Sequence, residues 1–62
     1  MYYVKEKREA CNLTQEELAK KAGVSRQTII SIETDRNFST STKTLIRLAQ
    51  ALECKVSDIF LD

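Results

Sequence analysis

The chain has 62 residues, which is enough for one small domain and too few for two. Hydrophobic residues make up 42% of it, too large a share for a disordered chain, and its single glycine and lack of proline argue against turn-rich β structure. Ten basic and nine acidic residues leave a net charge of +1, which does not decide for or against a nucleic-acid partner, because basic residues can gather on one face. We expect a single domain over 1–62, built from helices.

Several classes of protein are excluded at this level. No apolar run approaches the roughly 18 residues of a membrane-spanning helix, and the first residues lack the apolar stretch of a signal peptide, so we expect a cytoplasmic protein without a membrane partner. Cys11 and Cys54 are too few for a disulfide framework, and no histidine is present to complete a zinc site. We expect two reduced thiols that fill space, no metal, no cofactor and no small-molecule ligand.

The first helix is predicted over residues 4–10, where lysine and glutamate alternate and apolar positions are few. Such a segment is mostly solvated, and we expect it to reach the core through Val4, Arg8 and Cys11. A second helix follows at Thr14, because Thr-Gln-Glu-Glu has the pattern of a capping box between Thr14 and residue 17.

The second helix carries one apolar stripe, formed by Leu18, Ala19 and Ala22, and Gly23 is placed to end it with a positive φ. The chain restarts at once with Ser25, a good helix N-cap. Two helices joined by so short a turn around a glycine form a helix-turn-helix unit, here over about 14–33.

The remaining chain is predicted to hold a polar loop and two further helices. The loop covers 34–42, the fourth helix is capped by Ser41 or Thr42, and its apolar positions recur at helical spacing through 45–52. The last helix covers 55–60, with a cap expected near Ser57. The fold class is therefore all-α, a five-helix bundle with no sheet.

Two long segments resemble the Cro and phage-repressor family of helix-turn-helix regulators, also called the xenobiotic-response-element family. The resemblance runs from Leu13 to Glu33 through the T-Q-E-E-L-A and G-V-S-R-Q-T-I motifs, and from Leu45 to Phe60 through L-I-R-L-A-Q-A-L and V-S-D-I-F. It implies a lambda-repressor-like fold and a bacterial or phage transcription regulator, most simply a repressor, associated with the nucleoid. It also implies a homodimer on a palindromic operator in double-stranded DNA.

In this family the helix over 25–33 lies in the major groove. Since Ile29 and Ile32 belong to its apolar face, the side chains left to face outward are Arg26, Gln27, Ile30 and Ser31. Arginine pairs with guanine and glutamine with adenine, while an isoleucine can touch a thymine methyl and a serine can bond a base or a phosphate. The bland alternative is a merely solvated helix N-terminus.

Phosphate contacts are expected from three other places. The resemblance puts the Gln15 side chain on a phosphate at a helix N-terminus, although an ordinary surface glutamine is the alternative. Thr28, the next polar residue after Arg26 and Gln27, is also expected to bond a phosphate. In the loop the donors and cations are Arg36, Asn37, Ser39, Thr40, Thr42 and, beyond it, Lys43. Here the chain lacks the Asn-Gly turn and proline common in the family, and an ordinary loop is the alternative.

The resemblance also implies a structural ion pair between Arg8 and Glu33, which would join the first helix to the end of the recognition helix. Arg8 lies at i+4 from Val4, on the face turned to the core.

No catalytic constellation is present, so we expect no enzyme. The rival hypothesis is a partner-binding module of the same fold, such as an antitoxin, with DNA binding secondary. For the dimer interface the sequence offers Ile59, Phe60, Leu61 and the region of Cys54 and Lys55. Since Ile59 and Phe60 can instead close the core over the fourth helix, Leu61 is the better interface candidate.

Overall fold

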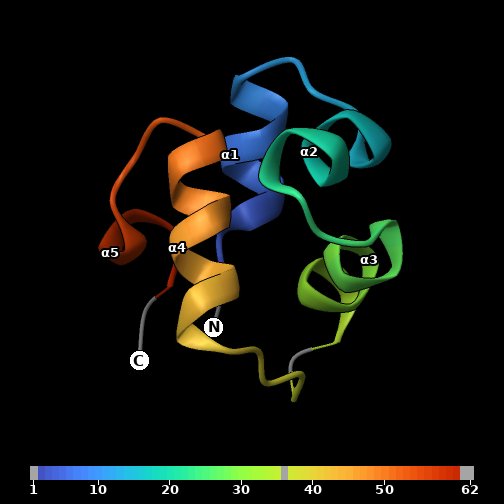
Figure 1. Ribbon diagram of the computed structural model, residues 1–62, viewed down its shortest axis with the longest axis vertical. Coiled ribbons are helices and arrows are strands. Elements are labelled where there is room, and N and C mark those ends of the chain that lie inside the picture. Colours follow the sequence, from blue (N-terminus) through green and yellow to red (C-terminus); the bar gives the residue numbers. More distant parts are fainter. Residues whose placement is uncertain (1, 36, 61–62) are drawn as a thin grey trace.

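A computed structural model describes residues 2–35 and 37–60 and shows five α-helices there. They are α1 (Val4–Ala10), α2 (Gln15–Ala22), α3 (Arg26–Thr34), α4 (Thr42–Ala51) and α5 (Val56–Ile59). α2 and α3 pack together at one side of α4, and α5 lies at its other side (Figure 1). The expected all-helical, five-helix architecture is confirmed. No helix in the described ranges is both long and apolar enough to cross a membrane.

The core receives one fully buried side chain from every helix. These five side chains, each 0% exposed, are Val4, Leu18, Ile29, Leu48 and Ile59. Burial of a side chain of this size stabilises the folded state by about 1.5–3 kcal/mol. A domain of this size has little reserve of stability, so the caps at the ends of its helices, worth about 1 kcal/mol each, contribute noticeably to it.

α2 begins with the expected capping box. The Thr14 hydroxyl accepts the Glu17 amide hydrogen at 3.0 Å, and the Thr14 amide donates to the Glu17 carboxylate at 2.8 Å. The hydrogen bond from the Thr14 backbone amide favours the ionised carboxylate and contributes most to holding the pKa of Glu17 below its usual value, with a smaller contribution from the Thr14 side chain. The start of α2 is thus held by reciprocal hydrogen bonds.

α3 and α4 begin with serine caps. Ser25 Oγ accepts the amide of Thr28 at 3.1 Å, and Ser41 Oγ accepts the amide of Thr44 at 3.2 Å. Ser41 therefore caps α4, which settles the choice between Ser41 and Thr42. The loop is shorter than expected at its start, because α3 continues through Thr34.

Two expectations about the ends of helices are wrong. Ser57 does not cap α5, because it already lies inside that helix; the extended residue before it is Lys55, whose amide donates to the Asp58 carboxylate at 2.9 Å. Cys11 is exposed, since it follows the last turn of α1, and its thiol only approaches the carbonyl oxygen of Leu52 at 3.9 Å.

Cys54 does pack against the core, and both cysteines are free thiols. Burial, with a smaller contribution from the Asp58 carboxylate, raises the pKa of the Cys54 thiol. This thiol is therefore protonated at neutral pH and is a poor nucleophile.

The two ends of the described chain meet, a feature that the sequence did not predict. Tyr2 and Phe60 form an isolated antiparallel bridge, and the amide of Tyr3 donates to the carbonyl oxygen of Ile59 at 2.7 Å. The rings of Tyr2 and Phe60 lie 5.2 Å apart between centroids at an angle of 38°, a tilted aromatic pair. This contact ties the start of α1 to the end of α5.

A residue with a left-handed backbone follows within two positions of the end of α1, α2 and α4. The φ angles are 57° at Asn12, 71° at Gly23 and 54° at Glu53. After each one, the next amide bonds back across the last turn at about the same length, to Arg8 at 3.1 Å, to Ala19 at 3.0 Å and to Ala49 at 2.9 Å. Glycine and asparagine tolerate this conformation, whereas a glutamate is strained in it.

We therefore predict that Glu53→Gly raises the free energy of unfolding by about 0.5–1 kcal/mol, because the relief of strain exceeds the entropy that glycine adds to the unfolded chain. Gly23→Ala should lower it by about 1 kcal/mol through strain alone, since an added Cβ meets no atom within 4 Å. Urea denaturation measures both. Glu53→Ala removes the same charge without freeing the backbone, and an equal gain from it would contradict the prediction.

Candidate nucleic-acid interface

α3 has an outer face that the rest of the described fold leaves uncovered. It follows α2 after the three residues 23–25 and buries Ile29 and Ile32 against the core. A helix turns by about 100° per residue, so the positions opposite this buried edge are Gln27 and Thr34, with Ser31 beside them. The short turn of the helix-turn-helix unit thus leaves a polar stripe of α3 facing away from the core.

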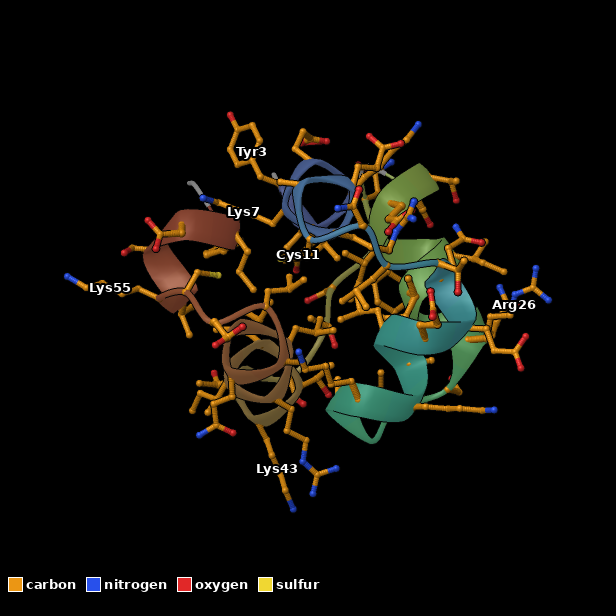
Figure 2. The ribbon with its side chains drawn as sticks, turned by 90° about the horizontal axis from the view of Figure 1, so that it is seen from above. Tyr3, Lys7, Cys11, Arg26, Lys43 and Lys55 are labelled. Carbon is orange, nitrogen blue, oxygen red and sulfur yellow. The ribbon has the colours of Figure 1, made fainter. Side chains whose placement is uncertain are left out.

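The first turn of α3 presents the two largest polar side chains of this face. Arg26 and Gln27 are exposed, and Arg26 points out on the side of the molecule opposite to Lys55 (Figure 2). Ser31 is half-buried. Ile30 is half-buried as well, so it is not the fully outward apolar residue expected from sequence, because a branched side chain in a helix leans back over the preceding turn.

Hydroxyl groups along α3 are mostly occupied within the helix. Thr28 and Ser25 share a hydrogen bond between their hydroxyls at 2.8 Å, and Thr34 donates to the carbonyl oxygen of Ile30 at 2.7 Å. Gln27 Nε2 donates to Ser31 Oγ at 3.4 Å. Thr34 lies on the outward stripe but is absent from the predicted site, because it was assigned to the loop; its spacing of seven residues from Gln27 is the signal that could have found it.

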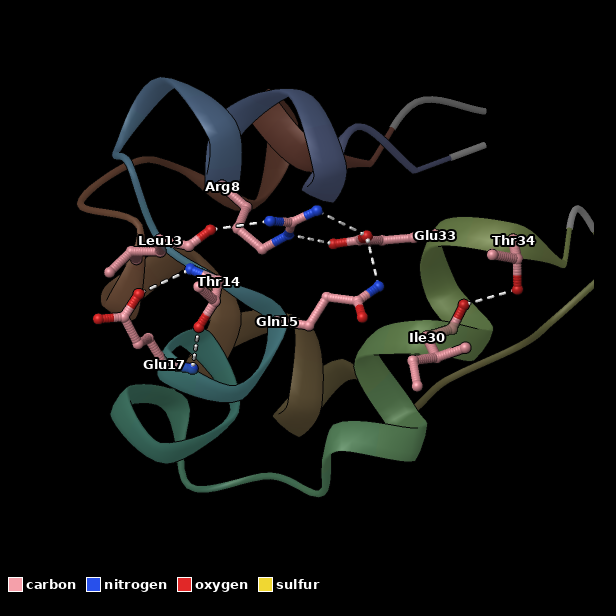
Figure 3. A network of polar contacts seen from close by, with 8 residues as sticks. All are labelled: Arg8, Leu13, Thr14, Gln15, Glu17, Ile30, Glu33 and Thr34. Carbon is pink, nitrogen blue, oxygen red and sulfur yellow. Dashed lines mark hydrogen bonds and ion pairs between the residues drawn. The ribbon is translucent and has the colours of Figure 1, made fainter.

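Behind this face, Arg8 and Glu33 form a two-pronged ion pair (Figure 3). Arg8 Nε lies 2.7 Å from one carboxylate oxygen of Glu33 and Nη2 lies 3.1 Å from the other. The Glu33 side chain is 2% exposed and that of Arg8 is 12% exposed. The hydrogen bond to Glu33 contributes most to raising the pKa of Arg8. The Arg8 guanidinium therefore stays charged although its side chain is largely shielded from solvent.

The same two side chains hold further parts of the fold. Arg8 Nη1 donates to the carbonyl oxygen of Leu13 at 2.8 Å, which fixes the connection between α1 and α2. Gln15 Nε2 donates to Glu33 at 3.1 Å, so the first residue of α2 joins the network (Figure 3). Because a carboxylate only accepts hydrogen bonds, Gln15 must turn its NH₂ group toward Glu33. Its other N–H and its oxygen remain for an outside partner.

The predicted phosphate contacts of the loop and of the start of α4 are less closely grouped than the residues of α3. Asn37 and Ser39 are exposed and Thr40 is half-buried, while the backbone is shaped by the Asp35 carboxylate, which accepts the amide of Asn37 at 2.9 Å. Arg36 lies outside the described residues. Lys43 is exposed on α4, in a different direction from Arg26 (Figure 2).

One basic residue near the helix-turn-helix turn was not singled out from sequence. Arg47 of α4 is exposed, and its Nη1 donates to the carbonyl oxygen of Gly23 at 3.4 Å. Arg47 is recognised as part of this region only in the folded structure, because it lies 24 residues from Gly23 in the sequence. Across residues 2–35 and 37–60, no three metal-ligating side chains gather into a possible metal site.

Comparison with known proteins gives consistent similarities. The profile of the helix-turn-helix family matches residues 4–59. An uncharacterized HTH-type transcriptional regulator of Methanocaldococcus jannaschii is 52% identical over 50 residues, which are 81% of this chain and 74% of that protein. A protein of Archaeoglobus fulgidus with the same description is 41% identical over 94% of this chain and 80% of its own length. Another, of Methanothermobacter thermautotrophicus, is 46% identical over 94% of this chain and 84% of its own length. These relatives are archaeal, whereas the resemblance to phage repressors points to a bacterial or phage source.

We predict that Glu33→Ala lowers the free energy of unfolding by about 3–5 kcal/mol, because it leaves the nearly buried Arg8 charge without its partner. Thermal unfolding followed by circular dichroism measures this loss. The control is Glu16→Ala, which breaks the exposed pair of Glu16 and Lys20 at 3.6 Å and should cost about 0.5 kcal/mol or less. Equal melting temperatures for the two variants would show that the ion pair has no structural role.

Proposed function

The chain belongs to the helix-turn-helix family, and on that premise we propose that it is a sequence-specific transcriptional regulator that lays α3 in the major groove of double-stranded DNA. The observation that carries this proposal is the exposed pair of Arg26 and Gln27 at the first turn of α3. Recognition helices present their N-terminal residues to base edges, and these two side chains complement guanine and adenine.

A polar outer face on α3 favours DNA over a protein partner. Gln27, Ser31 and Thr34 supply donors and acceptors along this stripe, and Ile30 shows only part of its side chain, enough for contact with a thymine methyl. Among the described residues the large hydrophobic side chain that is clearly exposed is Ile46, 44% of it, and it lies on α4. The rival function, a partner-binding module, would use that helix rather than α3.

The remaining expected residues are proposed as phosphate contacts that set the position of α3. Gln15 is suited to this role because Glu33 holds its NH₂ group while one N–H stays free. Thr28 would have to exchange its bond to Ser25 for one to a phosphate. The loop and the start of α4 would add Arg36, Asn37, Ser39, Thr40 and Lys43.

We propose repression as the outcome of binding, because a small domain that occupies an operator acts by keeping other proteins off that DNA. We propose further that two copies bind a palindromic operator, so that two α3 helices enter major grooves about 34 Å apart. Ile59 is fully buried and cannot supply the interface. The half-buried rings of Tyr2 and Phe60, which form a tilted pair, are the better candidates, and Leu61 lies outside the described residues.

The first test is selection from a random duplex library by the wild type and an Arg26→Ala/Gln27→Ala variant. We expect the wild type to enrich a palindromic site, and the variant to lose about 1–3 kcal/mol of discrimination for each lost base contact. The variant should keep weak, salt-sensitive binding to any duplex. Binding is measured at two salt concentrations.

The matched control for this test is Lys5→Ala, which removes one exposed positive charge from α1, a helix that supplies none of the proposed DNA contacts. It should leave the selected site unchanged. A wild type that enriches no sequence, or a control that loses as much discrimination as the variant, would refute the role of α3 in reading DNA.

The second test concerns the dimer. Light scattering with and without operator DNA should give the mass of two chains on DNA. Phe60→Ser should shift the population toward one chain, because it removes one of the two rings, Tyr2 and Phe60, that are proposed to form the interface. Thermal unfolding of the same variant shows whether it remains folded. One chain per operator in the wild type, at high protein concentration, would remove the dimer from the proposal.

A further inference from the structure

We infer that Ser31 is a positioning residue that orients the Gln27 side chain to read adenine, rather than a base contact in its own right. This inference rests on the proposed function of α3 and adds to it a preferred base and a division of roles within the helix. The observation behind it is the hydrogen bond from Gln27 Nε2 to Ser31 Oγ at 3.4 Å, one helical turn apart on the outward stripe.

The chemistry of the amide allows both contacts at once. A glutamine NH₂ group has two N–H bonds, and only one of them lies beside the carbonyl oxygen. That N–H and the oxygen together match the N7 acceptor and the N6 donor of adenine. The second N–H is not needed by the base, and it is therefore free to bond Ser31. The Ser31 hydroxyl can donate as well as accept, and the arrangement in which it accepts from Gln27 Nε2 is the one that leaves the adenine-matching N–H and oxygen unused.

The orientation of the Gln27 amide matters because this side chain is exposed and flexible before it meets DNA. An unrestrained glutamine loses rotamer freedom when it binds, and its reversed amide would present an oxygen to N7, where two acceptors repel. Ser31 is half-buried, so its hydroxyl is a steadier anchor than water. The neighbouring hydroxyl on this stripe, Thr34, already donates to the carbonyl oxygen of Ile30 and is placed a further turn away.

The contact can be tested without DNA. Side-chain amide signals in a proton–nitrogen NMR spectrum distinguish Gln27 from Gln50, which is exposed on α4 and serves as the reference. Ser31→Ala should move the Gln27 signals toward the shifts and exchange rates of Gln50 and leave those of Gln50 in place. Gln27 signals that do not move in Ser31→Ala would overturn the inference and leave the proposed function of α3 intact.

The consequence for recognition is tested by selection from a random duplex library with the wild type, Gln27→Ala, Ser31→Ala and the double variant. Both single variants should relax the preference for adenine at the same base pair, Ser31→Ala by about threefold to tenfold, the size of one modest hydrogen bond. The double variant should show no more loss than Gln27→Ala. Ser31→Thr keeps the hydroxyl and should restore the preference.

Three results would count against this division of roles. If Ser31→Ala changes a different base pair, or if the two losses multiply in the double variant, Ser31 is an independent contact. If Ser31→Ala weakens binding to every duplex equally, it acts on phosphate or on the fold. A wild type that selects no sequence overturns the proposed function, and this inference with it.

Discussion

The ion pair between Arg8 and Glu33 is the constraint on which the rest of the structure depends. Its guanidinium holds the connection after α1, its carboxylate holds the first side chain of α2, and the carboxylate itself stands near the end of α3. α2 and α3 pack on the shared core through buried side chains such as Leu18 and Ile29. The hydrogen bonds of Glu33 to Gln15 of α2 and to Arg8 of α1 add directional contacts between these helices.

This arrangement links stability to recognition within one short helix. Ile29, Ile32 and Glu33 bind α3 to the domain, while Gln27 and Ser31, on the same nine residues, face outward. Because the helix is so short, a substitution that moves its buried face also moves the side chains on its outward face. Gln15 shows the same double use, since one N–H of its side chain bonds Glu33 and the rest of its amide faces outward.

Most of the fold could be predicted because its signals are local. The capping box at Thr14, the serine caps at Ser25 and Ser41 and the glycine at Gly23 each act within four residues, so their spacing in the sequence carries the whole interaction. Long-range contacts could not be predicted in this way. Nothing in the order of residues marks the Tyr2 and Phe60 pair or the bond from Arg47 to Gly23. The predicted cap of α5 is wrong because Ser57 lies inside the helix, where the Asp58 carboxylate instead accepts the amide of Lys55. For the site, the outward pair of Arg26 and Gln27 follows from helical periodicity, whereas the bonds that occupy Thr28, Thr34 and Gln15 depend on side-chain geometry.

The bridge between Tyr2 and Phe60 has a consequence for how this domain can be combined with others. Since the chain enters and leaves the fold at one place, any polypeptide joined before Tyr2 or after Phe60 departs from a common point. Tyr3, beside that point, lies across the molecule from Arg26 (Figure 2). A sensor, a tag or a second DNA-binding unit could therefore be attached at either end without lying between α3 and a duplex.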